Sequence, residues 1–293
     1  MSMGLDTPRR PAVSINLGDE VIPYDHIVNP DLLARVDELH GKFVATQPFP
    51  HIVLDGFFSP TLLETVLNEF DSAHRDDWKK IESDRESIIR SRPDAELGPA
   101  SRVYFDTLSS GRFIRFLSAL TGIAGLLPDP LLRGGCLHES RSGGWFDVHV
   151  DFAKHSVTNL DNRLLLITYL NKDWLPAHGG ALELWSASEK RCVVKVVPEF
   201  GRTVILRHSE NSLHGHPDPI VAPDGRVRRS VAAYYYTNGG DDQAAVERYT
   251  TYFATAPVAS RKAKLASGLK LVLPPLIFSA GRLALRQLMQ RSK

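Results

Sequence analysis

The sequence has few features that would place it outside the ordinary globular proteins. It contains two cysteines in 293 residues, which is too few for a disulfide framework and favours a reducing, cytoplasmic location. No apolar segment approaches the roughly 18 uninterrupted residues of a membrane-spanning helix, and no apolar stretch follows the early arginines as it would in a secretory signal. A hydrophobic share of 43% with 24% charged residues predicts a soluble chain with a substantial core.

Acidic residues are absent from the last part of the chain. Glu247 is the last of them, and nine basic residues follow it. Because the formal net charge of the whole chain is +1, the residues up to Glu247 carry a net charge of −8. Leucines accompany the basic residues over 261–293, so this segment could contact a membrane surface or another subunit, or form a solvated helical appendage. No nucleic-acid-binding motif is present, and a nucleic-acid partner is not expected.

The chain is expected to divide into three parts. Residues 1–28 mix proline, glycine and polar residues without periodicity and predict a loosely held N-terminal arm. Residues 29–245 form the main domain, and residues 246–293 form the basic helical extension. The stretch 71–102 is dense in charge and contains an Arg-Pro-Asp turn, so it is either a long surface loop or a lid over a binding site.

Helical patterns dominate the first half of the main domain, residues 29–130. Asn29 can cap a helix that Gly41 would end, and Ser59 can cap a second helix with an apolar stripe. A third helix is expected over 113–120. A short strand over 49–54 precedes the second helix.

The second half, residues 131–240, has the pattern of an all-β core. Short apolar or alternating runs are separated by Gly, Pro, Asn and Asp, with no long helical segment between them. The expected strands cover 134–140, 145–150, 164–170, 181–185, 192–197, 203–206, 212–215 and 230–237. Eight such strands favour a double-sheet jelly roll over a parallel α/β fold. The predicted fold class is α+β with a mainly β core, a jelly roll flanked by N-terminal helices and a C-terminal helical extension.

A His-x-Asp triplet near the end of one expected strand carries the first chemical signal. Strand alternation directs His149 and Asp151 to the same face, where an imidazole and a carboxylate can bind a divalent metal. A third ligand can come from His214 or His216. Two imidazoles and one carboxylate leave three positions open at an octahedral Fe(II), which suits a chelating co-substrate and O2. A local hydrogen bond between the His and the Asp is the alternative, and the absence of a CxxC pair disfavours zinc.

Two arginines begin the last expected strand of the core. A guanidinium directed into the barrel would need an anion, because an unpaired buried charge is costly, and its planar fork suits a carboxylate. A dicarboxylic acid that chelates iron at one end and pairs with Arg228 or Arg229 at the other would satisfy both sites. Two solvated arginines at a strand end are the alternative interpretation.

Five motifs in order give the region a family resemblance. They are HVD (149–151), RLLLITYLNKDW (163–174), GGALELW (179–185), SLHG (212–215) and RRSVAAYYYT (228–237). Over residues 131–240 this series resembles the Fe(II)/2-oxoglutarate dioxygenases of the prolyl 4-hydroxylase type, and YLNKDW is similar to the core strand of the oxygen-sensing prolyl hydroxylases. The resemblance implies a distorted double-stranded β-helix, in agreement with the strand count.

The resemblance also implies which residues form the site. His149, Asp151 and His214 would bind Fe(II), with His216 as the alternative third ligand.

For the co-substrate, the Arg-x-Ser spacing implies that Arg228 pairs with the distal carboxylate of 2-oxoglutarate and that Arg229 points the other way. Tyr169 would hydrogen-bond the same molecule, and Leu182 would form an apolar wall beside it.

The implied cofactors are Fe(II), 2-oxoglutarate and O2, with ascorbate as a candidate addition. The implied activity is hydroxylation of an aliphatic carbon, with release of succinate and CO2. A prolyl or other amino-acid substrate, free or in a peptide, is expected, although relatives also act on other small molecules. The rival interpretation is a non-catalytic metal-binding jelly roll that recognises a small ligand or a partner.

Overall fold

The computed structural model describes residues 13–253, except 73–74, 94, 224 and 240–247. The expected contact through 261–293 lies outside the described residues. Within the described ranges, no helix is both long enough and apolar enough to cross a membrane.

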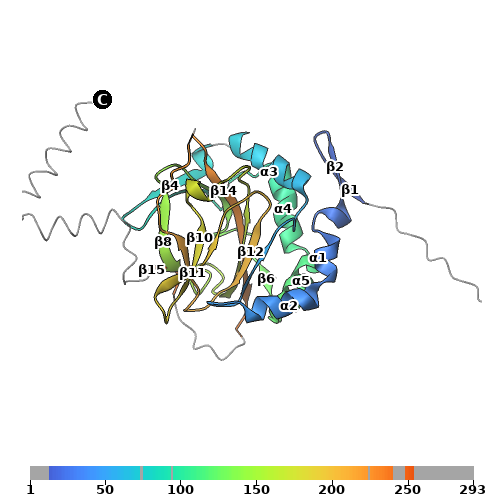
Figure 1. The fold of residues 1–293 in the computed structure, drawn as a ribbon. Helices are drawn as coiled ribbons and strands as arrows, with labels where there is room; N and C mark the ends of the chain where they lie inside the picture. Colours follow the sequence, from blue (N-terminus) through green and yellow to red (C-terminus); the bar gives the residue numbers. More distant parts are fainter. Residues whose placement is uncertain (1–12, 73–74, 94, 224, 240–247, 254–293) are drawn as a thin grey trace, which may run out of the picture.

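Five α-helices of the described chain lie together on one side of the molecule (Figure 1). They are α1 (Pro30–Ala34), α2 (Val36–Ala45), α3 (Pro60–Ser72), α4 (Pro99–Ser109) and α5 (Gly111–Thr121). The Asn29 side chain accepts a hydrogen bond from the Asp31 N–H, so the predicted cap is confirmed. The predicted stop at Gly41 is wrong: α2 continues to Ala45, since the buried Phe43 anchors its last turn in the core.

The strands form a hairpin and one large antiparallel sheet that curls into a barrel. The hairpin is β1 (Ser14–Leu17) and β2 (Glu20–Pro23). The sheet contains β3 (His51–Leu54), β4 (Trp78–Glu82), β5 (Glu86–Ser91), β6 (Leu127–Pro128), β7 (Cys136–Ser140), β8 (Trp145–Val150), β9 (Asp161–Tyr169), β10 (Leu182–Ser186), β11 (Arg191–Val196), β12 (Thr203–Arg207), β13 (Leu213–His216), β14 (Arg228–Thr237) and β15 (Tyr252–Phe253). The eight core strands expected from the sequence are all present, from β7 to β14.

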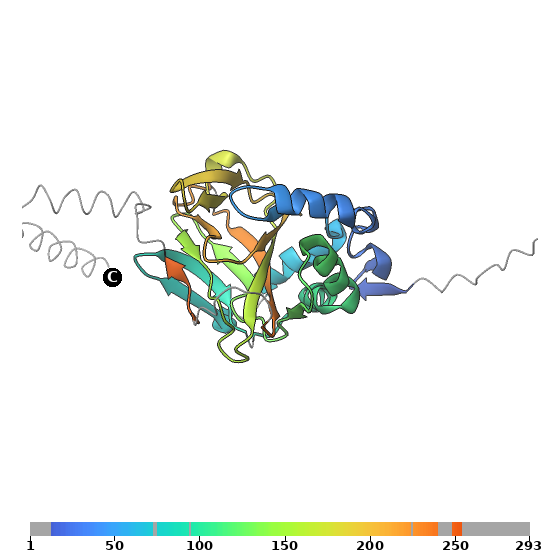
Figure 2. The same cartoon turned by 90° about the horizontal axis from the view of Figure 1, so that it is seen from below.

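The order of strands in the sheet decides which side chains can meet. The path runs β11-β10-β13-β8-β5-β7-β14-β9-β12-β3, so strands far apart in the sequence are neighbours. The helices cover the face beside β12 and β6, while β8, β10 and β11 lie on the far side (Figures 1 and 2). This arrangement is a jelly-roll-like barrel with helices on one face, so the predicted mainly β core with flanking N-terminal helices is confirmed. The expected C-terminal helical extension lies outside the described residues.

Two hydrophobic cores result from strand alternation. The larger core lies between the helices and the sheet and contains Phe57, Tyr104 and Phe113, while the smaller one lies inside the barrel and contains Leu182 and Tyr234. The helix-facing core stabilises the sheet, and the inner core leaves room beside it for a cavity.

Two segments differ from the sequence expectation. Part of the expected loose arm forms the β1–β2 hairpin, because Leu17 and Ile22 are buried in the larger core. The charge-dense stretch 71–102 contains β4, β5 and the start of α4. β5 pairs with both β7 and β8 and buries Ile88, so hydrogen bonding and burial hold this charged segment in the sheet.

Candidate functional site

A cavity of about 650 Å³ opens inside the barrel. Its wall comes from the inward faces of β5, β7, β8, β13 and β14, and from residues 249–251 and Phe253. Nearly every site residue expected from the sequence lies on this wall: His149, Asp151, Tyr169, Leu182, His214, His216 and Arg228.

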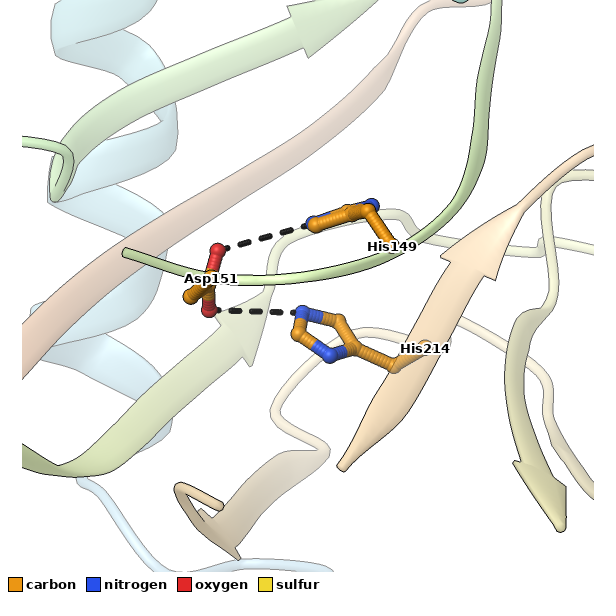
Figure 3. A group of neighbouring side chains, drawn as sticks. All are labelled: His149, Asp151 and His214. Atoms are coloured by element: carbon orange, nitrogen blue, oxygen red, sulfur yellow. Dashed lines mark ion pairs between the residues drawn. The ribbon is translucent and has the colours of Figure 1, made fainter. Parts of the chain in front are cut away.

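Three buried side chains at the cavity converge on one point. The Nε2 atoms of His149 and His214 each lie 3.5 Å from a different oxygen of Asp151. One potential ligand atom from each residue falls within 4.8 Å of the others. Figure 3 shows both rings directed at the carboxylate. His149 and His214 are far apart in the sequence. The sheet brings them together because β8 pairs with β13 and the two histidines are direct partners in that pairing.

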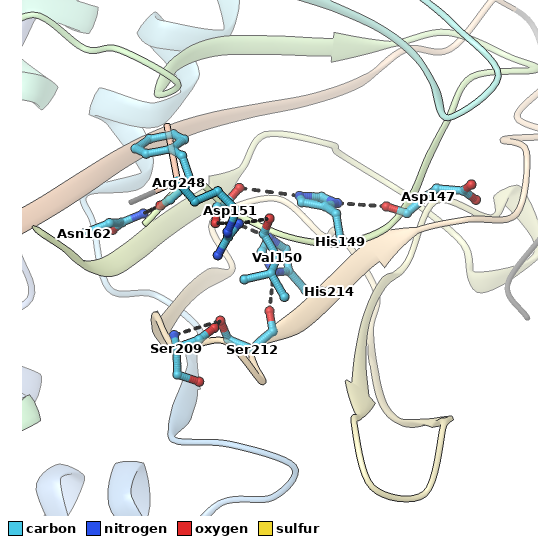
Figure 4. A network of polar contacts seen from close by, with 10 residues as sticks. Asp147, His149, Val150, Asp151, Asn162, Ser209, Ser212, His214 and Arg248 are labelled. Atoms are coloured by element: carbon cyan, nitrogen blue, oxygen red, sulfur yellow. Dashed lines mark hydrogen bonds and ion pairs between the residues drawn. The ribbon is translucent and has the colours of Figure 1, made fainter. Parts of the chain in front are cut away.

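Backbone carbonyls fix the protonation of both rings. His149 Nδ1 lies 2.8 Å from the Asp147 carbonyl oxygen, and His214 Nδ1 lies 2.9 Å from that of Ser212 (Figure 4). A carbonyl only accepts, so each Nδ1 donates, and the Nε2 lone pair of a neutral ring faces Asp151. This pattern of a ligating imidazole that donates through its other nitrogen is typical of metal sites.

The pKa values of two of the donors, His214 and Asp151, are shifted toward the unprotonated form. Burial lowers the pKa of His214, which favours the neutral ring that a metal needs. Burial alone would raise the pKa of Asp151, but the two imidazoles outweigh it and lower that pKa. The three residues thus fit a divalent metal with an oxygen and two nitrogen donors on one side.

A glycine allows the close pairing of these strands. A Cβ at Gly215 would stand 2.8 Å from the carbonyl oxygens of Phe146 and Asp147, so a side chain there would separate β13 from β8. This explains the glycine of the SLHG motif. His216, the alternative ligand, lines the cavity but is not in the converging group, and its Nδ1 is buried without a hydrogen-bond partner among the described residues.

Arg228 lies at the other end of the site. Its Nε donates to the Gly180 carbonyl at 2.7 Å, and its Nη2 lies 3.4 Å from the Tyr169 hydroxyl oxygen. The guanidinium carbon lies 5.0 Å from the Tyr169 ring centroid. Within the described ranges no carboxylate forms an ion pair with Arg228, and burial lowers its pKa. A Cβ at Gly180 would stand 2.9 Å from Arg228 Cδ, so the glycine leaves space for the arginine.

Arg229 points to the opposite side of β14. Its Nε lies 3.1 Å from Glu139 Oε1 and its Nη2 lies 2.5 Å from Asp71 Oδ1. The structure therefore places Arg228, rather than Arg229, on the cavity wall, as the Arg-x-Ser spacing implied. Tyr169 and Leu182 are buried beside it, and burial raises the pKa of Tyr169.

Sequence reasoning missed several cavity residues. The Phe146 ring stacks on His149 with centroids 3.9 Å apart, and the Phe253 ring centroid lies 5.9 Å from that of the same histidine. Arg248 donates to the Asp151 carbonyl at 2.5 Å (Figure 4). It also pairs with Glu210 at 2.7 Å. Phe146 precedes His149 by three residues, so regular strand alternation would place it on the opposite face. The irregular pairing of β8 with β13 between these two residues has no local sequence signal. The pairing of β15 with β8 has no local sequence signal.

Residues 136–236 match the family model described as the 2OG-Fe(II) oxygenase superfamily. This segment spans β7 to β14 almost entirely and includes all the residues discussed at the two ends of the site. The match covers the barrel core and less than half of the chain, so this core is similar to the dioxygenases that use Fe(II) and 2-oxoglutarate. A comparison with curated protein sequences found no match.

One solved prolyl hydroxylase structure shares the fold at low sequence identity, and two others are similar to the chain. A prolyl 4-hydroxylase from Phytophthora capsici has 18% identity and a TM-score of 0.52, covering 78% of this chain and 69% of its own. A Pseudomonas putida prolyl-4-hydroxylase has 20% identity and a TM-score of 0.48, covering 71% and 100%. A Trichoplax adhaerens prolyl hydroxylase in complex with a hypoxia inducible factor peptide has 18% identity and a TM-score of 0.49, covering 72% and 95%.

Proposed function

We propose that the chain hydroxylates an aliphatic carbon of a prolyl or other amino-acid or peptide substrate and releases succinate and CO2. The proposed Fe(II) ligands are His149, Asp151 and His214. The proposed contacts of 2-oxoglutarate are Arg228, Tyr169 and Leu182. The catalytic domain is proposed to span residues 29–245.

A single observation carries this proposal. A buried guanidinium without an acidic partner among the described residues and a group of three metal donors line the same cavity. An unpaired buried charge is unfavourable, so we expect Arg228 to bind an anion that the described residues do not supply. A ligand with a carboxylate at one end and a chelating group at the other satisfies both ends of the cavity, and 2-oxoglutarate has this form.

The side chains then have distinct tasks. Bound Fe(II) and 2-oxoglutarate supply the oxidising chemistry, with O2 as the oxidant. His149 and His214 present neutral nitrogen donors, and Asp151 supplies the third ligand. Its carboxylate fills a position that a small residue would leave to a halide, which favours hydroxylation over halogenation. Arg228 orients the co-substrate through its distal carboxylate, while Leu182 and the Tyr169 ring exclude water from that end.

The proposal of an amino-acid or peptide substrate follows the resemblance of the motifs and the names of the prolyl hydroxylases with this fold. A cavity of about 650 Å³ has room for 2-oxoglutarate and part of a substrate together.

The test is a screen of succinate release. Purified protein with Fe(II), 2-oxoglutarate and O2 is expected to form succinate slowly alone and faster with a substrate, across a panel of free amino acids, prolyl peptides and sugars. Mass spectrometry is expected to find one added oxygen atom in the substrate that stimulates turnover. Absence of succinate from folded, metal-loaded protein would contradict the proposal and favour a module that binds without turnover.

A further inference from the structure

Four charged side chains of the β4–β5 hairpin face the cavity and have no part in the proposed metal or co-substrate contacts. They are Lys79, Glu86, Arg90 and Arg92. Glu86, Ile88 and Arg90 alternate along β5, so all three project from the same face of the strand, with the buried Ile88 between the two charges. Arg90 and Glu86 are half-buried.

The cations of this hairpin are close to one another. Lys79 and Arg90 are direct partners in the β4–β5 register, and Arg92 follows Arg90 on the same side just beyond the end of β5. Like charges directly opposite each other on paired strands are destabilising unless an anion neutralises them. Arg133 and Arg228 are further cations of the cavity lining.

Glu86 is a described carboxylate whose charge acts on Arg90 and Lys79, and it is one anion beside three cations. None of Lys79, Arg90 and Arg92 forms an ion pair with a described carboxylate, whereas the neighbouring Lys80, which does not line the cavity, pairs with Glu82 at 2.7 Å. Glu86 is equally without a described ion pair, although Arg90 lies four residues along the same strand. The outward-facing Lys80 is therefore ion-paired, whereas the charged side chains that face the cavity have no described ion pair.

The positive charge reaches the interior of the cavity. Arg90 is the register partner of His138 on β7, another cavity residue. Burial and the charges of Arg90 and Arg228 together lower the pKa of His138 to about 4, against the opposing effects of the Gly135 carbonyl and Asp151. Arg228 is already assigned to 2-oxoglutarate in the proposed function, so Arg90 is a second cation available for another anion.

The geometry points to a primary substrate that carries an anionic group, a carboxylate or a phosphate, which binds to Arg90 with Lys79 and Arg92 beside it. The rest of the substrate then extends over Ile88 toward Glu86 and the metal donors, since Glu86 pairs in register with Phe146, whose ring stacks on His149. This inference rests on the proposed function, because it assigns the substrate of the same cavity.

The test uses two small anions as probes of Arg90. Protein loaded with Mn(II) and saturated with 2-oxoglutarate is titrated with inorganic phosphate and, separately, with carbon-13-labelled acetate. When an anion binds near the metal, Mn(II) speeds the nuclear relaxation of its phosphorus or carbon-13 atom. The Zn(II)-loaded protein gives the diamagnetic reference rate. Arg90→Gln is expected to weaken binding of the preferred anion by about tenfold or more, because a charge-assisted contact is lost. The probe that binds with the higher affinity shows whether the substrate carries a phosphate or a carboxylate.

Two further variants separate charge from structure. Arg90→Lys keeps the positive charge and is expected to retain most of the binding, and Lys80→Gln, a matched change on the outward side of the hairpin, is expected to bind as the wild type does. The affinity for 2-oxoglutarate is measured in the same samples, so failure of the co-substrate site is seen independently of the anion result. Equal binding by wild type and Arg90→Gln, or no relaxation of either probe by the wild type, would overturn the inference.

Discussion

The two faces of β14 show how one strand serves both stability and chemistry. Val231 and Tyr235 point to the helices and are buried in the larger core, whereas Ser230 and Tyr234 point into the cavity. The adjacent arginines at its start follow the same division, since Arg228 lacks an acidic partner in the described chain and Arg229 pairs with two acids. Substitutions on the cavity face should therefore change ligand binding, whereas substitutions on the helix face should change the free energy of unfolding.

The largest effect is expected at the metal donors on the cavity side. Asp151→Ala should lower the affinity for Fe(II) or Mn(II) by about 1,000-fold or more and abolish succinate release, because two imidazoles alone hold the ion poorly. Competition with a chelator measures the affinity. His216→Gln, a change in the same cavity outside the converging group, should keep the metal, and loss of metal in His216→Gln with retention in Asp151→Ala would contradict the assignment.

A similar change in energy is expected on the helix side, with a different consequence. Phe113 is buried among Phe57, Phe58, Phe116 and Tyr235, so Phe113→Ala should lower the free energy of unfolding by about 3–5 kcal/mol. Urea titration of the metal-free protein measures this change. The affinity of the folded fraction for 2-oxoglutarate should be unchanged, and a selective loss of that affinity would refute the separation of the two faces.

The paired arginines provide the sharpest test of that separation. Arg228→Gln should raise the Kd for 2-oxoglutarate about 10- to 100-fold with the metal still bound, since a buried bidentate contact is lost. Arg229→Lys, which keeps a charge beside Glu139 and Asp71, should leave the Kd unchanged. Titration of metal-loaded protein gives both values. Loss of the metal in Arg228→Gln would show that Arg228 does not act by binding the distal carboxylate of 2-oxoglutarate.

The smallest effect concerns a cavity histidine and pH. Burial and the nearby arginines lower the pKa of His138 to about 4, so the unfolded chain binds a proton that the folded chain does not between pH 6.5 and 4. The metal-free protein should therefore lose stability as the pH falls through this range. After allowance for partial exposure, we expect about 1–2 kcal/mol from His138. Urea unfolding at several pH values should show a shallower loss for His138→Gln than for wild type, and an identical slope would be contrary to this explanation.

Local patterns account for the parts of the fold that the sequence predicted. Alternation within each core strand is a property of a few consecutive residues, so all eight strands and the shared face of His149 and Asp151 could be inferred. The ambiguity between His214 and His216 could not be resolved in this way, because both lie on the same face of β13. The register of β13 against β8, which places His214 opposite His149, depends on pairing between distant segments.

The cavity wall formed by β5 is the main feature that local patterns did not reveal. Glu86, Arg90 and the surrounding charges suggested a surface loop or a lid, since sequence composition does not show that β7 and β8 lie on either side of β5. The same reason applies to Phe253, which reaches His149 only through the pairing of β15 with β8. The predicted helix stop failed for a related cause: burial of Phe43 outweighed the helix-ending tendency of Gly41.

The most direct test of the central assignment is an anaerobic titration of the metal-free protein with Fe(II) and 2-oxoglutarate, followed by visible absorption. A weak charge-transfer band should appear only when both are present, saturate at one equivalent of each per chain, and be absent in folded Asp151→Ala. If the folded wild type gives no band, or if Asp151→Ala gives the same band, then His149, Asp151 and His214 do not hold the iron to which the co-substrate binds.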